Sequence, residues 1–357
     1  MNKRYIALAI LVCLILLVSA CNRSGAATGG APRKPFIGGA GAITMNFEKD
    51  SPPPEVTDQG TFPFNVLVRL KNDGEFKVDK ENIRLNLIGF DPESFGSSFS
   101  ALNEVTPEDS LEPKKIDAEG NTVDGATTVA AFPSGGSDQF NARKFIGNTE
   151  FTFRVDACYL YGTQSSTKLC VLRDMVNVRD NSICKPNGAK TIYNSAGPVQ
   201  VTNFRQTVVG QKRLSFSFDI VLNGNVDIFY TKDTLTSPTT PSTGFDAACP
   251  RDPSARRQVE NNVAVAIVQI PVEDRVLDSL KCVSLDRGDI GVVKLVNQRR
   301  TITCTADIRQ ERVDLEKDIA INLLYNVLDS KETKVLVKHL ASDTSPGPSS
   351  GPGLIST

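Results

Sequence analysis

Acid–base catalysis has few candidate residues in this sequence. The only histidine of the 357 residues is His339, which ends an alternating run with Val335 and Val337. A histidine in that position is more often part of a strand than a general base, and the sequence indicates no Ser-His-Asp or Cys-His arrangement around it. We therefore expect no nucleophilic catalysis and do not predict an enzyme.

Paired carboxylates are the remaining candidates for general acid–base work. Three pairs lie close together in sequence, namely Glu108 with Asp109, Asp286 with Asp289, and Asp314 with Glu316. A hydrolase using such a pair would need its two carboxyl groups roughly 5–10 Å apart in a cleft. Charged side chains in loops are usually solvated, so a hydrolase ranks third among the functions considered below.

Two further motifs have residue types that bind ligands. Residues 117–121 (DAEGN), with Asp124 close by, offer oxygen ligands for calcium but lack the ordered spacing and the closing glutamate of the known calcium loop. Arg287-Gly288-Asp289 lies between two expected strands, where an exposed turn could act in adhesion, although a glycine between charged residues is ordinary turn composition. We predict no metal site and no cofactor.

The charge balance gives no indication of a nucleic-acid partner. The sequence holds 40 Lys and Arg against 41 Asp and Glu; removing a leader that contains Lys3 and Arg4 leaves 38 basic residues and a net charge of −3. No basic stripe with interleaved aromatic residues occurs. The apolar run at residues 263–272 is too short for a membrane helix and is interrupted by Gln269 and Pro271.

The first 21 residues have the layout of an export signal. Lys3 and Arg4 form a positive start, residues 6–18 are an apolar run shorter than a comfortable membrane span, and Val18-Ser19-Ala20-Cys21 resembles the lipobox of prokaryotic lipoproteins. The resemblance implies cleavage before Cys21 and a lipid on its thiol. The alternatives are a plain cleavage site or a leader that is retained as a short anchor.

The other cysteines indicate disulfide bonds. Setting aside Cys13 in the leader and Cys21 at the anchor leaves six, namely Cys158, Cys170, Cys184, Cys249, Cys282 and Cys304. An even number in an exported chain is typical of disulfide bonding. Zinc is not expected, because the sequence has no CxxC pair and only one histidine.

Spacing narrows the possible pairings of these cysteines. Cys282 and Cys304 lie in two apolar runs with turns between them, so a bridge within one sheet pair is favoured. A turn expected at residues 162–167 would make Cys158 and Cys170 cross-strand neighbours, which leaves Cys184 to pair with Cys249. A bridge between Cys170 and Cys184 is the alternative to the Cys158–Cys170 pair.

Most of the body alternates between apolar and polar residues with the period of two that is typical of strands. Many short strands with turns every 8 to 12 residues predict an all-β sandwich or barrel. Residues 97–140 are rich in Ser, Gly, Asp, Glu and Pro, and we expect long loops there with a weak strand near residues 127–132. Short helices are expected only near residues 255–261 and 272–279.

We predict two tandem Ig-like β-sandwich domains. Each begins with a strand of isolated large apolar residues, followed by a strongly alternating strand and an Asn-Gly or Asn-Asp-Gly turn, and duplication of one sandwich is the simplest account. The expected segments are a signal peptide at 1–20, a flexible tether at 21–42, a first sandwich with long loops at 43–184, a linker at 185–198, a second sandwich at 199–341 and a disordered tail at 342–357.

The sequence resembles one known group of proteins over most of its length. Residues 156–163 (DACYLYGT), followed by Leu169-Cys170-Val171 and Cys184, are similar to a Cys-Tyr-x-Tyr-x-Thr…Val-Cys-Ile…Cys pattern. That pattern occurs in uncharacterised, lipid-anchored, Ig-like surface proteins of archaea. Residues 51–53 with 64–74, and residues 198–202, are similar to the starts of the two sandwiches in that group. The resemblance implies an architecture and no reaction.

These observations lead us to expect a surface lipoprotein without catalysis. A lipid on Cys21 would hold it on the outer face of the cytoplasmic membrane, where it would be a structural or protein-binding module. Its partner would be an envelope or surface protein, and we expect no nucleic acid. The alternative is a ligand- or carbohydrate-binding lipoprotein, which would need exposed aromatic side chains; the sequence has no Trp and six Tyr.

Overall fold

The computed structural model describes residues 34–135, 138–231, 244–272, 275–309 and 314–340. All described strands and helices belong to one compact unit, Phe36–Thr357. Cys21, the expected signal peptide and the expected tail at 342–357 lie outside the described residues. Within the described ranges, no helix has the length and apolar character needed to span a membrane.

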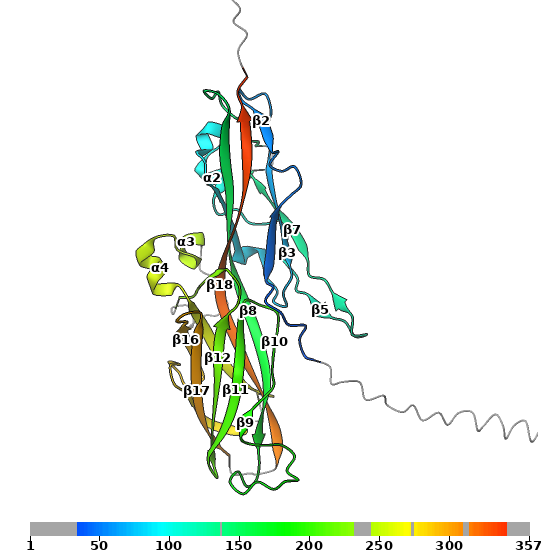
Figure 1. The fold of residues 1–357 in the computed structure, drawn as a ribbon, viewed down its shortest axis with the longest axis vertical. Helices are drawn as coiled ribbons and strands as arrows, with labels where there is room; N and C mark the ends of the chain where they lie inside the picture. The colour runs from blue at the N-terminus through cyan, green and yellow to red at the C-terminus, as the bar shows by residue number, and fades with distance from the viewer. Residues whose placement is uncertain (1–33, 136–137, 232–243, 273–274, 310–313, 341–357) are drawn as a thin grey trace, which may run out of the picture. The chain divides into compact units, whose positions relative to one another are not determined.

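Two very long strands form the centre of this unit. Strand β8 (Thr149–Val171) pairs with the antiparallel strand β18 (Leu315–Lys338) along its whole length, from Thr149 opposite Val337 to Val171 opposite Leu315. Figure 1 shows the two strands running side by side, with shorter strands on both sides of them at either end. We call this pair the central ribbon.

One set of strands surrounds the β2 end of the central ribbon. Strand β4 (Ile83–Ile88) pairs with β8, and the short strand β2 (Glu55–Thr57) runs parallel to the end of β18. A separate sheet has the order β1 (Ile43–Phe47), β3 (Val66–Asn72), β7 (Thr127–Phe132). Alternate residues of β3 are buried, as the period of two predicts.

A second set of strands surrounds the other end. There β10 (Ile192–Asn194) pairs with β8, and β18 pairs with β14 (Asn262–Ile270), which continues to β16 (Ile290–Lys294). The remaining sheet there has the order β15 (Leu277–Cys282), β17 (Arg299–Ile308), β12 (Arg213–Leu222), β11 (Val199–Gly210), β9 (Gly188–Ala189).

The other elements are short. They are η2 (Lys80–Asn82), η3 (Pro92–Phe95), α2 (Phe99–Leu102), the hairpin β5 (Lys115–Ile116) and β6 (Thr122–Val123), β13 (Asp227–Phe229), α3 (Phe245–Ala248) and α4 (Pro253–Val259). Helix α4 starts where Asp252 caps the backbone N–H groups of Ser254 and Ala255. Strand β13 pairs with β18 near its middle.

The buried apolar side chains form one large cluster that continues from one set of strands to the other. Aromatic rings dominate it near β2, where Phe90 stacks on Phe153 with ring centroids 4.1 Å apart. Near β9, the rings of Phe204 and Phe216 stack at 5.3 Å. The all-β fold predicted from the alternating sequence pattern is therefore confirmed, with sheets packed through apolar faces.

Some local expectations are confirmed and others are wrong. Strand β7 and helix α4 occur where the sequence indicated them. The helix expected at residues 272–279 is wrong, because the Gln269 side chain bonds the backbone of Val276 and Leu277 and β15 begins at Leu277. The turn expected at residues 162–167 is also wrong, because β8 continues through it.

Hydroxyl groups explain why β8 continues through a sequence that resembles a turn. Three inward-facing side chains of this stretch have hydrogen-bond partners: Thr163 with Tyr325, Ser165 with Asn194, and Thr167 with the carbonyl of Thr191. Buried polar groups are tolerated when they are hydrogen-bonded. Gly162 is needed for a different reason, since a Cβ there would lie 2.6 Å from the Phe76 ring.

Strands from both sides of the expected linker pair with one another. Residues 185–198 contain β9 and β10, which pair with β11 and β8. Strand β8 comes from the expected first domain and β18 from the expected second, yet each contributes to both sets of strands. The end of the expected tether is also ordered, since the carboxylate of Glu75 accepts hydrogen bonds from the backbone N–H groups of Ile37 and Gly38.

Candidate functional site

The six body cysteines form three disulfide bonds. The bonds join Cys158 to Cys249, Cys170 to Cys184 and Cys282 to Cys304. The Cys282–Cys304 bond and the alternative Cys170–Cys184 bond are confirmed. The expected Cys158–Cys170 and Cys184–Cys249 bonds are wrong, because twelve residues along the continuous strand β8 separate Cys158 from Cys170 by roughly 40 Å.

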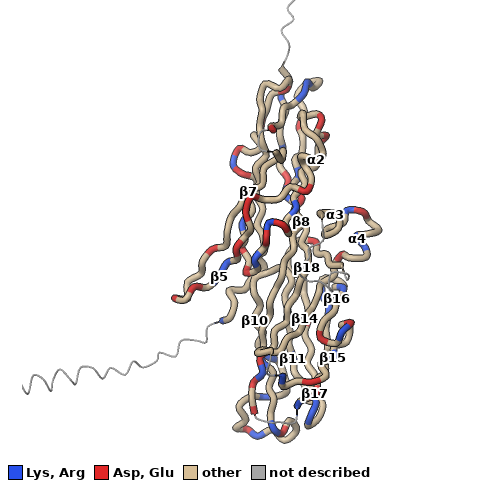
Figure 2. Tube along the Cα trace, turned by 180° about the vertical axis from the view of Figure 1, so that it is seen from behind, with Lys and Arg blue, Asp and Glu red and all other residues tan. Residues whose placement is uncertain are grey.

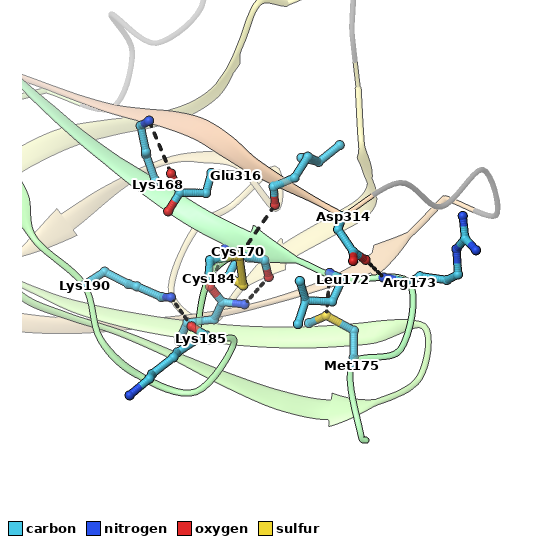
Figure 3. The surroundings of a disulfide bond; sticks show 12 residues. Lys168, Cys170, Leu172, Arg173, Met175, Cys184, Lys185, Lys190, Asp314 and Glu316 are labelled. Carbon is cyan, nitrogen blue, oxygen red and sulfur yellow. Dashed lines mark hydrogen bonds and ion pairs between the residues drawn. A yellow bond between two sulfur atoms is a disulfide. The ribbon is translucent and has the colours of Figure 1, made fainter. Parts of the chain in front are cut away.

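The Cys170–Cys184 bond closes a loop against strand β11. The buried amide of Gln206 donates to the carbonyl of Cys170 (2.8 Å) and accepts from its N–H (2.9 Å), which fixes the end of β8. Figure 3 shows the bond together with the side chains of Met175, Lys185 and Asp314 around it. The Cys158–Cys249 bond similarly attaches the residue that follows α3 to β8.

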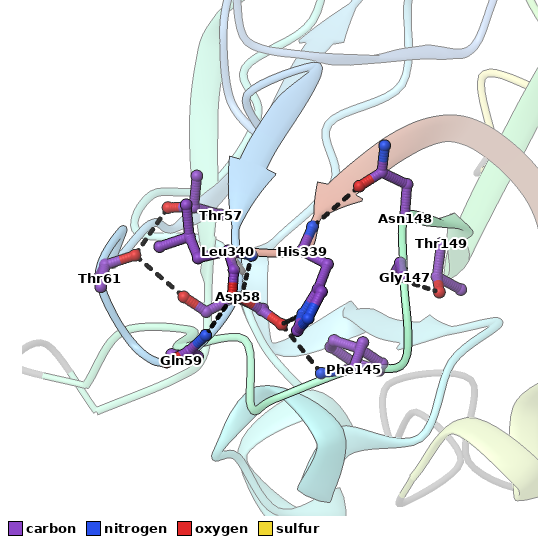
Figure 4. Close-up of polar contacts among 10 residues, drawn as sticks. All are labelled: Thr57, Asp58, Gln59, Thr61, Phe145, Gly147, Asn148, Thr149, His339 and Leu340. Carbon is purple, nitrogen blue, oxygen red and sulfur yellow. Dashed lines mark hydrogen bonds and ion pairs between the residues drawn. The ribbon is translucent and has the colours of Figure 1, made fainter. Parts of the chain in front are cut away.

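His339 belongs to a polar cluster that sequence reasoning did not find. Its Nδ1 lies 2.7 Å from Oδ2 of Asp58, a residue with 0% exposure. The same carboxylate accepts the backbone N–H groups of Leu340 (2.9 Å) and Phe145 (3.0 Å). Figure 4 shows the aspartate between the three donors. We call this arrangement the Asp58 latch, because it joins three segments that are distant in sequence.

The electrostatics of the latch favour an ionised aspartate. Burial alone would raise the pKa of Asp58, but the hydrogen bonds from Leu340, His339 and Phe145 outweigh it and lower the pKa to about 2. An ionised carboxylate only accepts hydrogen bonds, so Nδ1 of His339 carries the hydrogen between them. The His339 ring is therefore oriented by Asp58.

An oriented imidazole is one part of a hydrolytic triad, which also needs a nucleophilic hydroxyl. The nearby hydroxyls in the latch, those of Thr57 and Thr61, bond to each other at 2.7 Å, and Thr61 also donates to the carbonyl of Asp58. These bonds hold the backbone that follows β2 in place.

The latch also fastens the end of β18, because the N–H of Asp58 donates to the carbonyl of Lys338.

The two carboxylates of the Asp314 and Glu316 pair have separate partners. Asp314 accepts the backbone N–H of Arg173 at 2.6 Å, whereas Glu316 is paired with Lys168 on β8. Asp289 is half-buried and its carbonyl accepts from Ile267 N–H. Glu108 and Asp109 are exposed in a loop whose backbone bonds to β7.

The other motifs of the sequence form turns. Both carboxylate oxygens of Asp117 accept hydrogen bonds from Asn121 at the tip of the β5–β6 hairpin, and Asp124 pairs with Lys71 and Lys114 instead. In the described part of the chain, no three His, Cys, Asp or Glu side chains gather as metal ligands would.

Arg287-Gly288-Asp289 forms the turn between β15 and β16. Arg287 is exposed, and its N–H donates to the carbonyl of Ile290. Gly288 has a φ of 83° and a Cβ there would lie 2.7 Å from the carbonyl of Leu280, so the turn itself requires this glycine.

A second buried polar cluster lies at the middle of the central ribbon. The Tyr161 hydroxyl donates to the Ala196 carbonyl (3.0 Å), and the Glu75 carboxylate accepts from Ala196 N–H (2.7 Å). A Cβ on Gly74 would lie 1.7 Å from the Tyr161 hydroxyl oxygen. The residues before β1, the turn after β3 and the segment before β11 are therefore fastened to β8 at one place, which we call the ribbon junction.

No family model matches this sequence, and neither does any curated protein. Solved structures with weak structural similarity to it include the two described next. The secreted serine protease VesC from Vibrio cholerae has 8% identity and a TM-score of 0.16, with 78% of this chain and 49% of that chain covered. The collagen binding domain of the Erysipelothrix rhusiopathiae surface protein RspB has 9% identity and a TM-score of 0.11, with 84% and 91% covered.

This chain thus spans about half the length of the VesC structure. Similarities with such low TM-scores carry no argument about fold or function. The evidence for function therefore comes from the sequence and from the contacts described above.

Proposed function

We propose that this protein is an extracytoplasmic lipoprotein that acts as a structural or protein-binding module at the cell surface, without catalysis. The observation that carries the proposal is the central ribbon. All 23 residues of β8 are paired with β18, so the two sets of strands are joined by continuous backbone hydrogen bonds and not by a linker. Such pairing keeps the two sets of strands at a fixed distance and orientation relative to each other.

The disulfide bonds support both the location and the mechanical role. Disulfides persist mainly in oxidising compartments outside the cytoplasm, which agrees with an export signal. Two of the bonds attach further segments to β8, at Cys158 and at Cys170. Loads applied at one end would therefore be carried by covalent and hydrogen-bonded connections along the same two strands.

The proposed anchor is tested on the thiol of Cys21. Cells expressing the full chain are supplied with a lipid precursor that carries a chemical tag, and the protein is then partitioned between detergent and aqueous phases. We expect tag incorporation and detergent partitioning for the wild type and for Cys13→Ser, a matched change within the leader. Both should be lost in Cys21→Ser. Unchanged partitioning of Cys21→Ser would refute lipid anchoring at this residue.

Carbohydrate binding has less support from the side chains. Sugar recognition commonly uses exposed aromatic faces, but Tyr159, Tyr161, Tyr230 and Tyr325 are all at most 3% exposed. Tyr193 is half-buried, and Phe62 and Phe99 are exposed at 44% and 68%. A phenylalanine side chain has no hydrogen-bonding group for a sugar hydroxyl, so we do not propose a carbohydrate site.

A further inference from the structure

The end of the molecule near β9 is shaped by a loop that is fixed at several points. Residues 172–187 follow the end of β8, and the Cys170–Cys184 bond ties this loop back to β8. The carboxylate of Asp174 accepts hydrogen bonds from Val176 N–H, from Asn177 and from the side chain of Gln211 in the β11–β12 hairpin. These bonds lower the pKa of Asp174 well below its usual range, so the carboxylate stays ionised.

Loop and hairpin therefore form one surface. Asn187 accepts from Val208 N–H at 2.8 Å, and Arg173 N–H donates to Asp314. Because Val176 N–H and the Gln211 amide both donate to the same oxygen of Asp174, the loop lies directly beside the hairpin. We call residues 172–190 and 207–213 the basic end. Figure 2 shows Lys and Arg positions, with Asp and Glu positions among them, in the turns next to β11.

The basic end exposes aliphatic side chains. Their exposed fractions are 57% for Val176, 39% for Val178, 60% for Ile183 and 57% for Val209. Alternation along β11 explains the last of these, since Gln206 is buried and Val209 faces outward. None of these four side chains packs against a buried apolar cluster. Together, on a fixed loop and the adjoining hairpin, they offer an apolar surface for an external contact.

Its charge differs from that of the rest of the chain. The basic end has six Lys and Arg against two Asp, whereas the whole sequence has 40 against 41 acidic residues. Asp307 and Asp314 reach this surface from outside these segments, and Arg213 is ion-paired with Asp307.

Within the described residues, Arg179, Lys185 and Lys212 are exposed and form no ion pair. One of the two acids of the basic end, Asp174, is already occupied by internal hydrogen bonds. A negatively charged binding partner would complement this surface.

We propose that the basic end docks on an anionic lipid surface, with the aliphatic side chains in the boundary between headgroups and acyl chains and the basic side chains on the lipid phosphates. Outward-pointing aliphatic side chains surrounded by Lys and Arg are the arrangement that interfacial membrane binding uses. The contact does not depend on the lipid proposed for Cys21, because the two attachments are separate in the chain.

The test uses the chain from residue 22 onward, which contains every described element and no Cys21. Cosedimentation is measured with vesicles of phosphatidylcholine alone and with vesicles that contain phosphatidylglycerol. We expect binding only to the anionic vesicles, with affinity that falls as salt rises. Lys185→Glu with Lys212→Glu, and separately Val176→Asn with Ile183→Asn, should each weaken binding by about tenfold or more.

The control is the β5–β6 hairpin, which exposes both Lys115 and Ile116. Lys115→Glu with Ile116→Asn makes the same kinds of change elsewhere and should leave vesicle binding unchanged. Absence of binding, equal binding to both vesicle types, or an equal loss in the control would each overturn the proposal. Binding to polyglutamate without binding to vesicles would also overturn it and would assign the basic end to an acidic protein.

Discussion

The hydroxyl oxygens of Thr163 and Tyr325 lie 2.8 Å apart across the middle of the central ribbon, and both side chains are buried. Tyr325 also accepts the N–H of Val199 at the start of β11. Burial raises the pKa of Tyr325 and of the neighbouring Tyr161 above the usual range, so both hydroxyls remain donors at neutral pH. Residues 162–167, where a turn was expected, therefore lie where β8, β18 and the start of β11 are joined.

Substitution of Gly74 tests the ribbon junction. In Gly74→Ala the new Cβ would overlap the Tyr161 hydroxyl, which then has to leave its hydrogen bond with Ala196. We expect a loss of about 2–3 kcal/mol in the free energy of unfolding, measured by urea denaturation, from overpacking together with the buried bond.

Gly210→Ala is the matched control for that change. No atom lies within 4 Å of a Cβ at Gly210, and its φ is in the ordinary range. Its free energy of unfolding should stay within about 1 kcal/mol of the wild type. Equal stability of the two variants would contradict the close packing at Gly74.

Fragments of the chain test whether the two sets of strands are independent. Residues 34–184 contain β8 without β18, and residues 185–340 contain β18 without β8. Each fragment would expose a long unpaired strand edge, so we expect neither to give cooperative unfolding or a dispersed NMR spectrum alone. Coexpression should restore both properties. A cooperative transition in either isolated fragment would show that its sandwich folds independently.

Local pattern was sufficient for much of the fold. The alternation in β3 follows from a strand with one buried face. Strands β4 and β12 follow the same pattern except at the polar residues Asn86 and Asp219, which are also buried. The continuity of β8 depends instead on partners that are far away in sequence. Gly162, Thr163 and the serines that follow are turn residues by composition, and only their bonds to β10 and β18 favour a strand.

The disulfide pairing has the same explanation. A turn at residues 162–167 would place Cys158 and Cys170 on neighbouring strands. Because β8 is continuous through these residues, the two cysteines lie far apart on one strand. The latch was missed for a related reason. His339 was recognisable as a strand-end residue, but no local pattern marks Asp58, whose partners Phe145 and Leu340 are distant in the chain.

Disulfide connectivity is tested directly by mapping proteolytic peptides without reduction. We expect the three pairs found in the structure. Removing Cys158–Cys249 with alanines should lower the free energy of unfolding by about 4–5 kcal/mol, and removing Cys170–Cys184 by about 3 kcal/mol, because the first bond closes a loop of 91 residues and the second one of 14. Recovery of a Cys158–Cys170 peptide would refute the continuity of β8 at that point.

Acid titration tests the Asp58 latch. Because the pKa of Asp58 is about 2 in the folded chain and about 3.9 in an unfolded one, its ionised form stabilises the fold above pH 4, and this contribution is lost as pH falls toward 2. Asp58→Asn should be less stable than the wild type at pH 7 and lose less stability between pH 4 and 2. Asp180→Asn, a change at an exposed aspartate, should titrate like the wild type. Parallel curves for wild type and Asp58→Asn, measured by urea denaturation at each pH, would mean that the carboxylate does not hold the end of β18.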